Sequence, residues 1–409
     1  MSFVKTKLNI MAFKPANNIQ DLQYFGEFGG VNPSISDSST YTFLSAKTMF
    51  DTFEGNADGC YLYSRHTTPS NLYLGEALAA MEGTETANVT ASGMGAITSV
   101  LLQLCEAGNH IVSSRTIYGG TYAFLKNFTP RFNIETSFVD ITKLDVVEAA
   151  ITKNTKVLYC EAVSNPLLEV ADIKGLSLLA KKYNLKLVVD NSFSPLSISP
   201  AKLGADIILH SLTKFINGTS DTVGGVVCGT QEFIDDLRNV NSGASMLLGS
   251  TMDSLRAASI LKNLRTLHIR MQQHSLNASF LAEKFENLGL KTAYPGLESH
   301  PTNKLFKSMM NEKYGFGGML TIDVGSLEKA NELMEMMQKE NLGYLAVSLG
   351  FYKTLFSTPG TSTSSEIPED EQKEMGLNDG LIRFSIGLDA DIERTYSKMH
   401  ACMEKLNII

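Results

Sequence analysis

Residues 186–214 read KLVVDNSFSPLSISPAKLGADIILHSLTK and contain two short apolar runs that each end in polar side chains. The first run ends at Asp190, and the second passes through Ser211 to Lys214. Short, nearly continuous aliphatic runs between turn-forming segments are typical of the buried strands of a parallel sheet. The stretch therefore predicts two neighbouring strands, one ending in an acid and the other in a lysine.

The same alternation of short apolar runs and longer helical patterns extends over residues 61–250. The strand candidates are ANVT, HIVSS, ETSFV, KVLYCE, KLVVD, DIILH and GGVVCG. Strands that alternate with helices indicate an α/β fold with a mostly parallel sheet, here of seven strands.

The chain has 409 residues, too many for a single hydrophobic core, so we expect more than one domain. Residues 1–60 have little periodicity and are interrupted by Gly29, Gly30 and Pro33, which predicts an extended N-terminal arm. Such arms often clasp a neighbouring subunit. We expect residues 61–265 to form the large domain.

A helical pattern without proline covers residues 251–288 and predicts a helical link between two domains. After it, GMLTIDV and LIRFSIG read as strands, and 327–340 and 391–407 read as helices. Residues 266–409 are therefore predicted to form a smaller C-terminal α+β domain.

The composition favours small molecules as binding partners. Hydrophobic residues make up 43% and the net charge is -8, so no broad basic field exists to bind nucleic acid. No apolar stretch reaches the roughly 18 residues of a membrane span, and the N-terminus lacks a leader pattern, so the cytoplasm is expected. The five cysteines and seven histidines have no metal-ligand spacing, so no metal site is expected.

Polar residues gather where three predicted strands end, which is where open α/β sheets bind ligands. KVLYCE ends at Glu161 and leads to Asn165, KLVVD ends at Asp190, and DIILH leads to Thr213 and Lys214. An acid can pair with the pyridinium nitrogen of pyridoxal 5′-phosphate, and a lysine can form its Schiff base. A solvated lysine and a helix-capping aspartate would explain each residue alone, but their joint placement favours the cofactor site.

The segment TASGMGAITSVLLQL, residues 90–104, predicts a strand, a tight turn and a helix. The first backbone N–H groups of such a helix can hold an anion, so Ser92, Gly93 and Met94 are candidates to bind the phosphate. A plain strand-to-helix turn would also use glycine here. A dinucleotide fingerprint is disfavoured because the third glycine is missing and no acid ends HIVSS.

Three further side chains suit such a site. Tyr118 precedes a predicted helix, so it could stack on a planar ring and move protons, or be an ordinary half-buried tyrosine. Arg65 in Tyr63-Ser64-Arg65 could bind phosphate or lie in a surface turn. Arg383 lies in an apolar strand pattern and needs an anion, either a substrate carboxylate or an internal acid.

Nearly the whole chain resembles the cystathionine/methionine-metabolism family of fold-type-I pyridoxal-phosphate enzymes. The resemblance rests on YSRHTTPS, ASGMGAI, YGGTY, EAVSNP, VVDNSF, HSLTKFINGTSD, VSLG and GLIRFSIG, in the family's order and approximate spacing. It implies that Lys214 is the Schiff-base lysine, that Asp190 pairs with the ring nitrogen, and that Tyr118 stacks on the ring.

The resemblance also implies roles for the other site residues and an assembly. The phosphate would be held by Gly93, Met94, Ser211 and Thr213. Ser92, at the predicted helix start, and Glu161, at a predicted strand end, are counted with the cofactor site from their positions in the chain. Tyr63 and Arg65 would reach the phosphate of the neighbouring subunit, so the active sites would be completed in a dimer, usually within a tetramer of two dimers. Asn165, Ser348 and Arg383 would lie near the cofactor oxygen and the substrate carboxylate, and we add Thr363 as a candidate for the substrate site.

The stretches FGEFGGVNPSISDSSTYTF, YLYSRHTTPS, TSFVDIT and STPGTSTSSEI look most like those of plant-type methionine γ-lyases and their bacterial relatives. This likeness implies γ-elimination of L-methionine to methanethiol, 2-oxobutanoate and ammonia. Gly120 stands where bacterial methionine γ-lyases often have cysteine, and Lys353 where many relatives have glutamate.

Other activities within the family are also compatible with these motifs. The alternatives are a γ-replacement enzyme, either an O-acylhomoserine sulfhydrylase or a cystathionine γ-synthase, and a cystathionine γ-lyase. Elimination and replacement begin with the same chemistry and differ in whether the pocket admits a second nucleophile. A non-catalytic member is disfavoured because Lys214, Asp190 and Tyr118 are all present.

Overall fold

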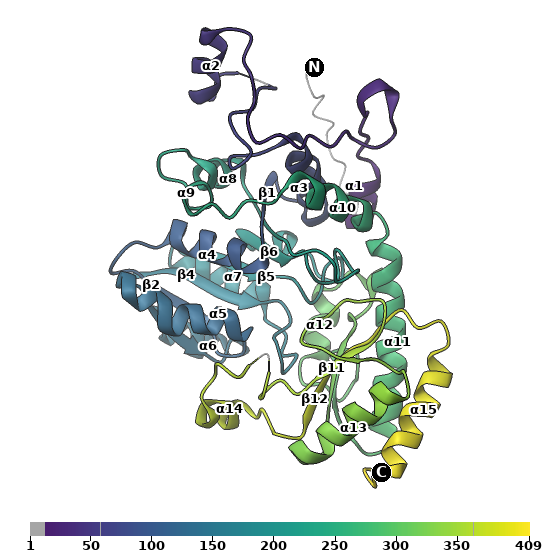
Figure 1. Cartoon of the computed structure of the whole chain (residues 1–409). Coiled ribbons are helices and arrows are strands. Elements are labelled where there is room, and N and C mark those ends of the chain that lie inside the picture. The colour runs from purple at the N-terminus through teal and green to yellow at the C-terminus, as the bar shows by residue number, and fades with distance from the viewer. Residues whose placement is uncertain (1–12, 58, 363) are drawn as a thin grey trace.

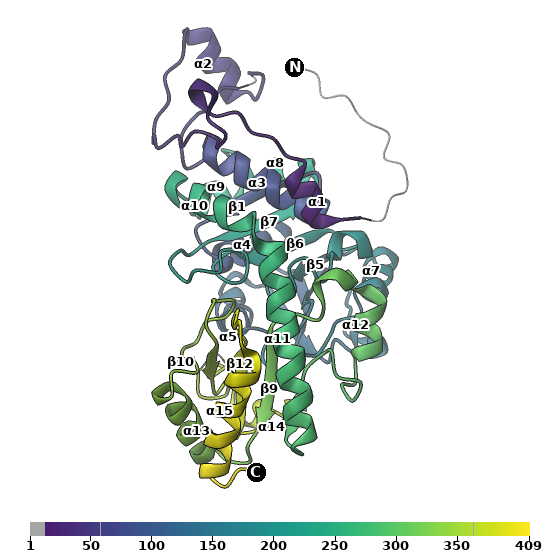
Figure 2. The ribbon, with the colours of Figure 1, turned by 90° about the vertical axis from the view of Figure 1, so that its right-hand side faces the viewer.

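The computed structural model describes residues 13–57, 59–362 and 364–409. Its two β-sheets are joined by the long helix α11 (Leu267–Asn287), which runs along the molecule from the larger sheet to the smaller one (Figures 1 and 2). An N-terminal arm projects from the opposite end of the larger part.

The larger sheet has seven strands in the order β1-β7-β6-β5-β4-β2-β3. Only β7 runs against its neighbours. All seven predicted strands are present in this sheet, within one residue at each end, so the predicted mostly parallel α/β architecture is confirmed. The bounds are β1 Thr86–Thr90, β2 His110–Ser114, β3 Glu135–Val139, β4 Thr155–Glu161, β5 Lys186–Asp190, β6 Ile207–Ser211 and β7 Gly225–Gly229.

Strands β5 and β6 are apolar because both of their faces are covered. Leu187 and Val189 belong to one buried cluster, whereas Val188 packs into another on the opposite face. Side chains of a strand alternate between its two faces, so neighbouring residues in the chain must belong to different cores. By the same alternation, Asp190 points to the face of Val188, and His210 points to the face of Ile208.

Helices cover both faces of the larger sheet (Figure 1). Apolar side chains of α3, α7 and α10 pack on the face of Leu187, and those of α4 and α8 pack on the other face. The helices of this part are α3 Pro69–Glu82, α4 Gly93–Leu104, α5 Gly119–Ala123, α6 Leu144–Ala149, α7 Ile173–Lys182, α8 Gln231–Arg238, α9 Ala244–Leu248 and α10 Ser254–Leu264.

The smaller sheet has five strands in the order β10-β11-β12-β9-β8. Helices α11, α13 and α15 supply the core on one of its faces. The two predicted strands and two predicted helices are present, but three short strands, β8, β10 and β11, were not predicted. The bounds are β8 Lys291–Ala293, β9 Met319–Asp323, β10 Tyr344–Leu345, β11 Leu355–Ser357, β12 Leu381–Ser385, α12 Asn303–Met309, α13 Leu327–Lys339, α14 Glu369–Met375 and α15 Ile392–Lys405.

The helical region predicted over 251–288 is two helices rather than one. Helix α10 ends at Leu264 and α11 begins at Leu267. The side chains of Thr266 and Arg270 both donate hydrogen bonds to the carbonyl oxygen of Asn263, which diverts it from the helical ladder. Residues of α11 enter the cores of both sheets, and the predicted domain division at residue 266 falls at its start.

The arm is largely irregular, as expected, but it contains two short helices. Helix α1 (Pro15–Gln20) packs on the body through Ile19, and the amide of Asn18 donates to the carbonyl of Ala80 over 3.2 Å. Helix α2 (Ala46–Phe53) projects away from the body (Figure 2). The arm exposes large apolar side chains, including Phe28 and Leu44.

Candidate active site

A pocket opens at the carboxyl ends of β4, β5 and β6, between the two sheets. It brings together eleven predicted site residues that lie up to 291 positions apart in the chain. They are Ser92, Gly93, Met94, Tyr118, Glu161, Asn165, Asp190, Ser211, Thr213, Lys214 and Arg383.

Of the remaining predicted site residues, one adjoins the pocket, two lie away from it and one is not described by the structure. The hydroxyl of Ser348 is 3.2 Å from Nζ of Lys214, so it adjoins the pocket. Tyr63 and Arg65 do not line the pocket; both are exposed, and Nη1 of Arg65 donates to the carbonyl of Met246 over 3.0 Å. Thr363 lies outside the described residues.

Lys214 lies in the turn that follows β6 and reaches into the pocket. Burial of its ammonium group, with a smaller contribution from the charge of Arg383, lowers its pKa to about 8. An amine with this pKa is largely neutral in mildly alkaline solution, and only the neutral form is a nucleophile. The site therefore favours the reactive form of this lysine.

Asp190 ends β5 and lies beside Glu161 in the strand register. Its Oδ1 accepts a hydrogen bond from the backbone N–H of Ser192 over 2.9 Å. Burial raises the pKa of Asp190, because a carboxylate charge is poorly stabilised away from water. A bound cation near this carboxylate would compensate for that lost hydration.

Glu161 is a buried acid that binds two neighbouring backbone segments. Its Oε1 accepts from the N–H of Tyr118 over 2.8 Å, and its Oε2 accepts from the N–H of Asn165 over 2.7 Å. Burial, and then the nearby charge of Asp190, raise its pKa to about 8. Glu161 thus fixes the backbone of two predicted site residues while also lining the pocket.

Arg383 enters the pocket from β12 of the smaller sheet. Its neighbours Ile382 and Phe384 face the helical core, so the alternation of the strand turns Arg383 to the opposite face. Its Nη1 donates to Oδ1 of Asn165 over 2.7 Å. Burial lowers the pKa of the guanidinium to about 10, although the charge of Glu161 acts in the opposite direction. The group stays cationic at neutral pH and suits a carboxylate ligand.

The N-terminus of α4 forms a cradle with the chemistry of a phosphate site. Ser92 caps the helix by accepting from the N–H of Gly95 over 2.9 Å. A Cβ on Gly93 would lie 2.9 Å from Cβ of Ser211, so only glycine permits this close approach. Free helix N–H groups and the hydroxyls of Ser211 and Thr213 are suitable donors to a phosphate.

Several pocket residues were not predicted. Ser192 and Phe193 directly follow Asp190 in VVDNSF, so their position in the chain could have indicated them. Val223, Val347 and Leu349 form an apolar part of the lining; Val347 and Leu349 flank Ser348 in the motif VSLG, whereas Val223 lies in none of the quoted motifs. Only the folded chain brings these apolar residues to the pocket.

A nucleophilic lysine, a buried carboxylate and a phosphate cradle within one α/β pocket are what pyridoxal phosphate requires of its protein. The fold and the site together define a pyridoxal-phosphate-dependent enzyme.

Comparison with known proteins identifies the family. The chain belongs to the Cys/Met metabolism PLP-dependent enzymes, whose family model matches residues 17–396. The fold-class prediction and the prediction of the cofactor are both confirmed by the family and its solved structures.

Three relatives show the range of the family. The chain is 45% identical to a methionine γ-lyase of Arabidopsis thaliana over 96% of this chain and 91% of that protein. It is 37% identical to a cystathionine γ-lyase of Bacillus subtilis over 80% and 85% of the two chains. A structure assigned as an O-acetylhomoserine (thiol)-lyase of Campylobacter jejuni, which contains a pyridoxyl-lysine phosphate, has a TM-score of 0.89 at 28% identity and covers 96% and 100% of the chains.

Across the described ranges 13–57, 59–362 and 364–409, no helix is long and apolar enough to cross a membrane.

Proposed function

We propose that the protein catalyses γ-elimination of L-methionine with water, giving methanethiol, 2-oxobutanoate and ammonia. The observation that carries this proposal is that one pocket contains both a reactive lysine, Lys214, and an apolar wall. The amine of Lys214 has a lowered pKa, and Val223, Val347 and Leu349 line the same pocket. Such a wall suits an uncharged methylthio group better than the charged distal end of cystathionine.

The cofactor would be held by the residues of the larger sheet. Lys214 would bind it covalently, Asp190 would face its ring nitrogen, and Tyr118 would stack on the ring. The phosphate would be held by Ser92, Gly93, Met94, Ser211 and Thr213. Glu161 would fix the backbone of Tyr118 by accepting a hydrogen bond from its N–H. When bound, pyridoxal phosphate withdraws electrons from the substrate and makes its Cα proton acidic.

The amino acid would be oriented by the residues between the two sheets. Arg383 would bind its carboxylate, and Asn165, which already accepts a hydrogen bond from Arg383, would help to orient it. Ser348 lies within hydrogen-bond distance of Lys214 and could guide its amine as it moves. Thr363 is proposed for the same substrate site from its place in the sequence.

Two side chains would move protons during the elimination. Lys214 would take the Cα proton at Nζ, because its neutral amine is accessible near pH 8. A Cβ proton must also leave before the Cγ–S bond can break, and the same amine would take it after passing on the first proton. The hydroxyl of Tyr118, a residue that is 43% exposed, would give a proton to the departing methanethiolate. Both groups line the same pocket, as proton transfer to a single bound substrate requires.

We also propose that the active site is completed by a second copy of the chain, in a dimer of dimers in the cytoplasm. Tyr63 and Arg65 are exposed and lie outside the pocket of their own chain, which is compatible with a contribution to a neighbour. The apolar side chains that the arm exposes would then be covered by that neighbour.

The test is release of 2-oxobutanoate by the cofactor-loaded protein given methionine alone, with methanethiol measured in parallel. The expected result is that both products form at equal rates. Product that forms only when an O-acylhomoserine and a thiol are supplied together would contradict the elimination.

A γ-replacement activity is the second candidate, because the Campylobacter jejuni structure assigned as an O-acetylhomoserine (thiol)-lyase covers nearly this whole chain. It would use the same residues for the first steps. Two rates measure the share of replacement in the total activity. One is the formation of a new thioether from O-acetylhomoserine and a thiol, and the other is the release of 2-oxobutanoate without thiol.

A further inference from the structure

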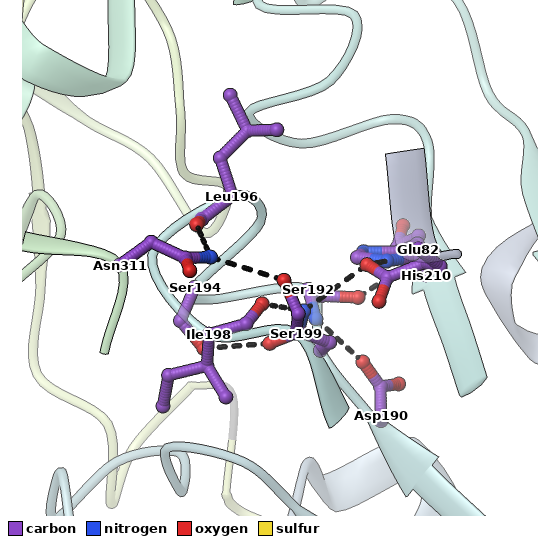
Figure 3. Close-up of polar contacts among 11 residues, drawn as sticks. Glu82, Asp190, Ser192, Ser194, Leu196, Ile198, Ser199, His210 and Asn311 are labelled. Carbon is purple, nitrogen blue, oxygen red and sulfur yellow. Dashed lines mark hydrogen bonds and ion pairs between the residues drawn. The ribbon is translucent and has the colours of Figure 1, made fainter. Parts of the chain in front are cut away.

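Behind the pocket, on the other face of the larger sheet, Glu82, Asn191 and His210 form a buried polar network, which we call the rear network. Figure 3 shows Glu82 and His210 pointing toward each other. Nε2 of His210 and Oε1 of Glu82 are 2.7 Å apart, and the amide of Asn191 donates to the same oxygen over 3.2 Å. All three side chains are at most 1% exposed. Glu82 is the last residue of α3.

The rear network contacts the two strand ends that carry the proposed cofactor ligands. Asn191 directly follows Asp190, and His210 directly precedes Ser211. Side chains alternate along a strand, so these neighbours point to opposite faces of the sheet. One carboxylate oxygen of Glu82 therefore joins β5 and β6 from behind, at the positions where both strands turn into the pocket.

The pocket face has a matching set of hydrogen bonds. The N–H of Ser211 donates to the hydroxyl of Ser192 over 2.7 Å, and the N–H of Ser192 donates to Oδ1 of Asp190 over 2.9 Å. The backbone N–H of Asn191 also donates to the carbonyl of Leu209 over 2.8 Å. The segment after Asp190 is thus fixed to β6 from both faces of the sheet.

Stability alone explains the rear network poorly. Within the described residues, Oε2 of Glu82 and Nδ1 of His210 are buried and have no hydrogen-bond partner. Unsatisfied buried polar atoms are unfavourable, and apolar side chains of similar volume often replace buried pairs without loss of stability. Burial raises the pKa of Asp190, and His210 is close enough to act weakly in the opposite direction. The network thus lies directly behind the proposed cofactor carboxylate.

We propose that Glu82 and His210 are positioning residues for the cofactor site, acting through Asn191 and Ser211 to keep Asp190 in register with the turn that carries Lys214. Neither residue touches the pocket. This inference rests on the proposed roles of Asp190 and Lys214, and it does not depend on which amino acid is the substrate.

The test compares disruptive and conservative variants of the cofactor-loaded protein. The double variant E82L/H210L removes both polar groups while it keeps the volume filled, and E82Q and H210Q keep a hydrogen-bonding group at nearly the same place. We expect E82L/H210L to bind pyridoxal phosphate at least about tenfold more weakly and to shift its visible absorption band. The Gln variants should recover most of the affinity.

Asn311 provides the matched control. Its amide donates to the carbonyl of Leu196 over 2.7 Å and to the hydroxyl of Ser199 over 3.0 Å, so it supports the same loop without touching the rear network (Figure 3). N311A should lower thermal stability while leaving cofactor affinity within about twofold of the parent.

The proposal is overturned if folded E82L/H210L binds the cofactor with the affinity and absorption band of N311A. If the double variant does not fold, unchanged cofactor affinity and absorption in H210A and E82A would overturn it equally. Methionine elimination is measured separately: its absence from a parent protein with normal cofactor binding would contradict the proposed substrate and leave the positioning role intact.

Discussion

The two sheets contribute to one pocket in different ways. From the larger sheet, adjacent strand ends bring Glu161, Asp190 and Lys214 together, and the hydrogen-bonded register fixes their spacing. From the smaller sheet, Arg383 projects from β12, whereas Ser348 lies on the connection between β10 and β11. Glu161 and Asp190 thus lie on the hydrogen-bonded ladder and Lys214 follows it by three residues, whereas part of the proposed substrate site lies on a connection.

This difference suggests how relatives with different activities can share a fold. The positions on the ladder are constrained by backbone pairing and by two cores, so a small shift would disturb many contacts. Connecting segments tolerate more change. We therefore expect changes in the larger sheet to alter cofactor binding, and changes in the smaller sheet to alter amino-acid binding.

The largest effect is expected for Lys214. K214A removes both the proposed covalent attachment and the proposed base, so turnover should fall about a thousandfold or more. The visible band of lysine-bound cofactor should disappear from the absorption spectrum. K143A removes a lysine whose side chain is 63% exposed and should change neither. Steady turnover by K214A would contradict the proposal that Lys214 binds the cofactor covalently and acts as the base.

The next largest effect is expected for Asp190, the proposed partner of the ring nitrogen. D190N preserves the volume but removes the charge expected to pair with the ring nitrogen, and a hydrogen bond to a charged group contributes about 1.5–3 kcal/mol. Cofactor affinity should fall about ten- to hundredfold. Equilibrium titration with pyridoxal phosphate measures this. Affinity equal to that of the parent would show that the acid does not bind the ring.

A change at Arg383 tests whether the smaller sheet serves amino-acid binding rather than cofactor binding. R383K keeps a positive charge but loses the two-pronged geometry that binds a carboxylate, so kcat/KM for the amino acid should fall about tenfold or more. The absorption spectrum without substrate should stay unchanged. If R383K instead lost cofactor and kept its KM, the division of labour between the two sheets would be wrong.

The lowered pKa of Lys214 predicts how uptake of the cofactor depends on pH. The neutral amine accumulates as pH rises through about 8, so the rate at which apoprotein binds pyridoxal phosphate should increase about tenfold between about pH 7 and 9. The positive charge of Arg383 contributes to lowering this pKa, so R383M should move the midpoint to higher pH. A parent midpoint near the ordinary lysine pKa would contradict the prediction.

The smallest effect is expected for a hydrogen bond that joins α5 of the larger part to α14 of the smaller part. The hydroxyl of Tyr122, on α5, donates to Oε2 of Glu371 on α14 over 2.7 Å. Y122F removes this one hydrogen bond, which contributes about 1 kcal/mol, so the KM for the amino acid should rise by no more than about fivefold. K126A alters an exposed partner of the same acid and should have no effect. A change in cofactor binding would contradict this prediction.

The sequence was more informative for one sheet than for the other. Strands of the larger sheet are buried on both faces, so each appears as a distinct apolar run bounded by turns. Strands β8, β10 and β11 have two or three residues each, too few to show a period. The break between α10 and α11 was missed because it depends on side-chain hydrogen bonds to Asn263 rather than on proline or glycine.

By itself, the sequence determined the α/β architecture, the pyridoxal-phosphate family and the residues that gather at three strand ends, because local periodicity and compact motifs encode them. Only the tertiary structure decided that Ser348 adjoins Lys214, that Arg383 meets Asn165, and that Glu82 lies behind the pocket. These contacts join residues more than one hundred positions apart. They depend on how two sheets and their helices pack, and no local pattern records that packing.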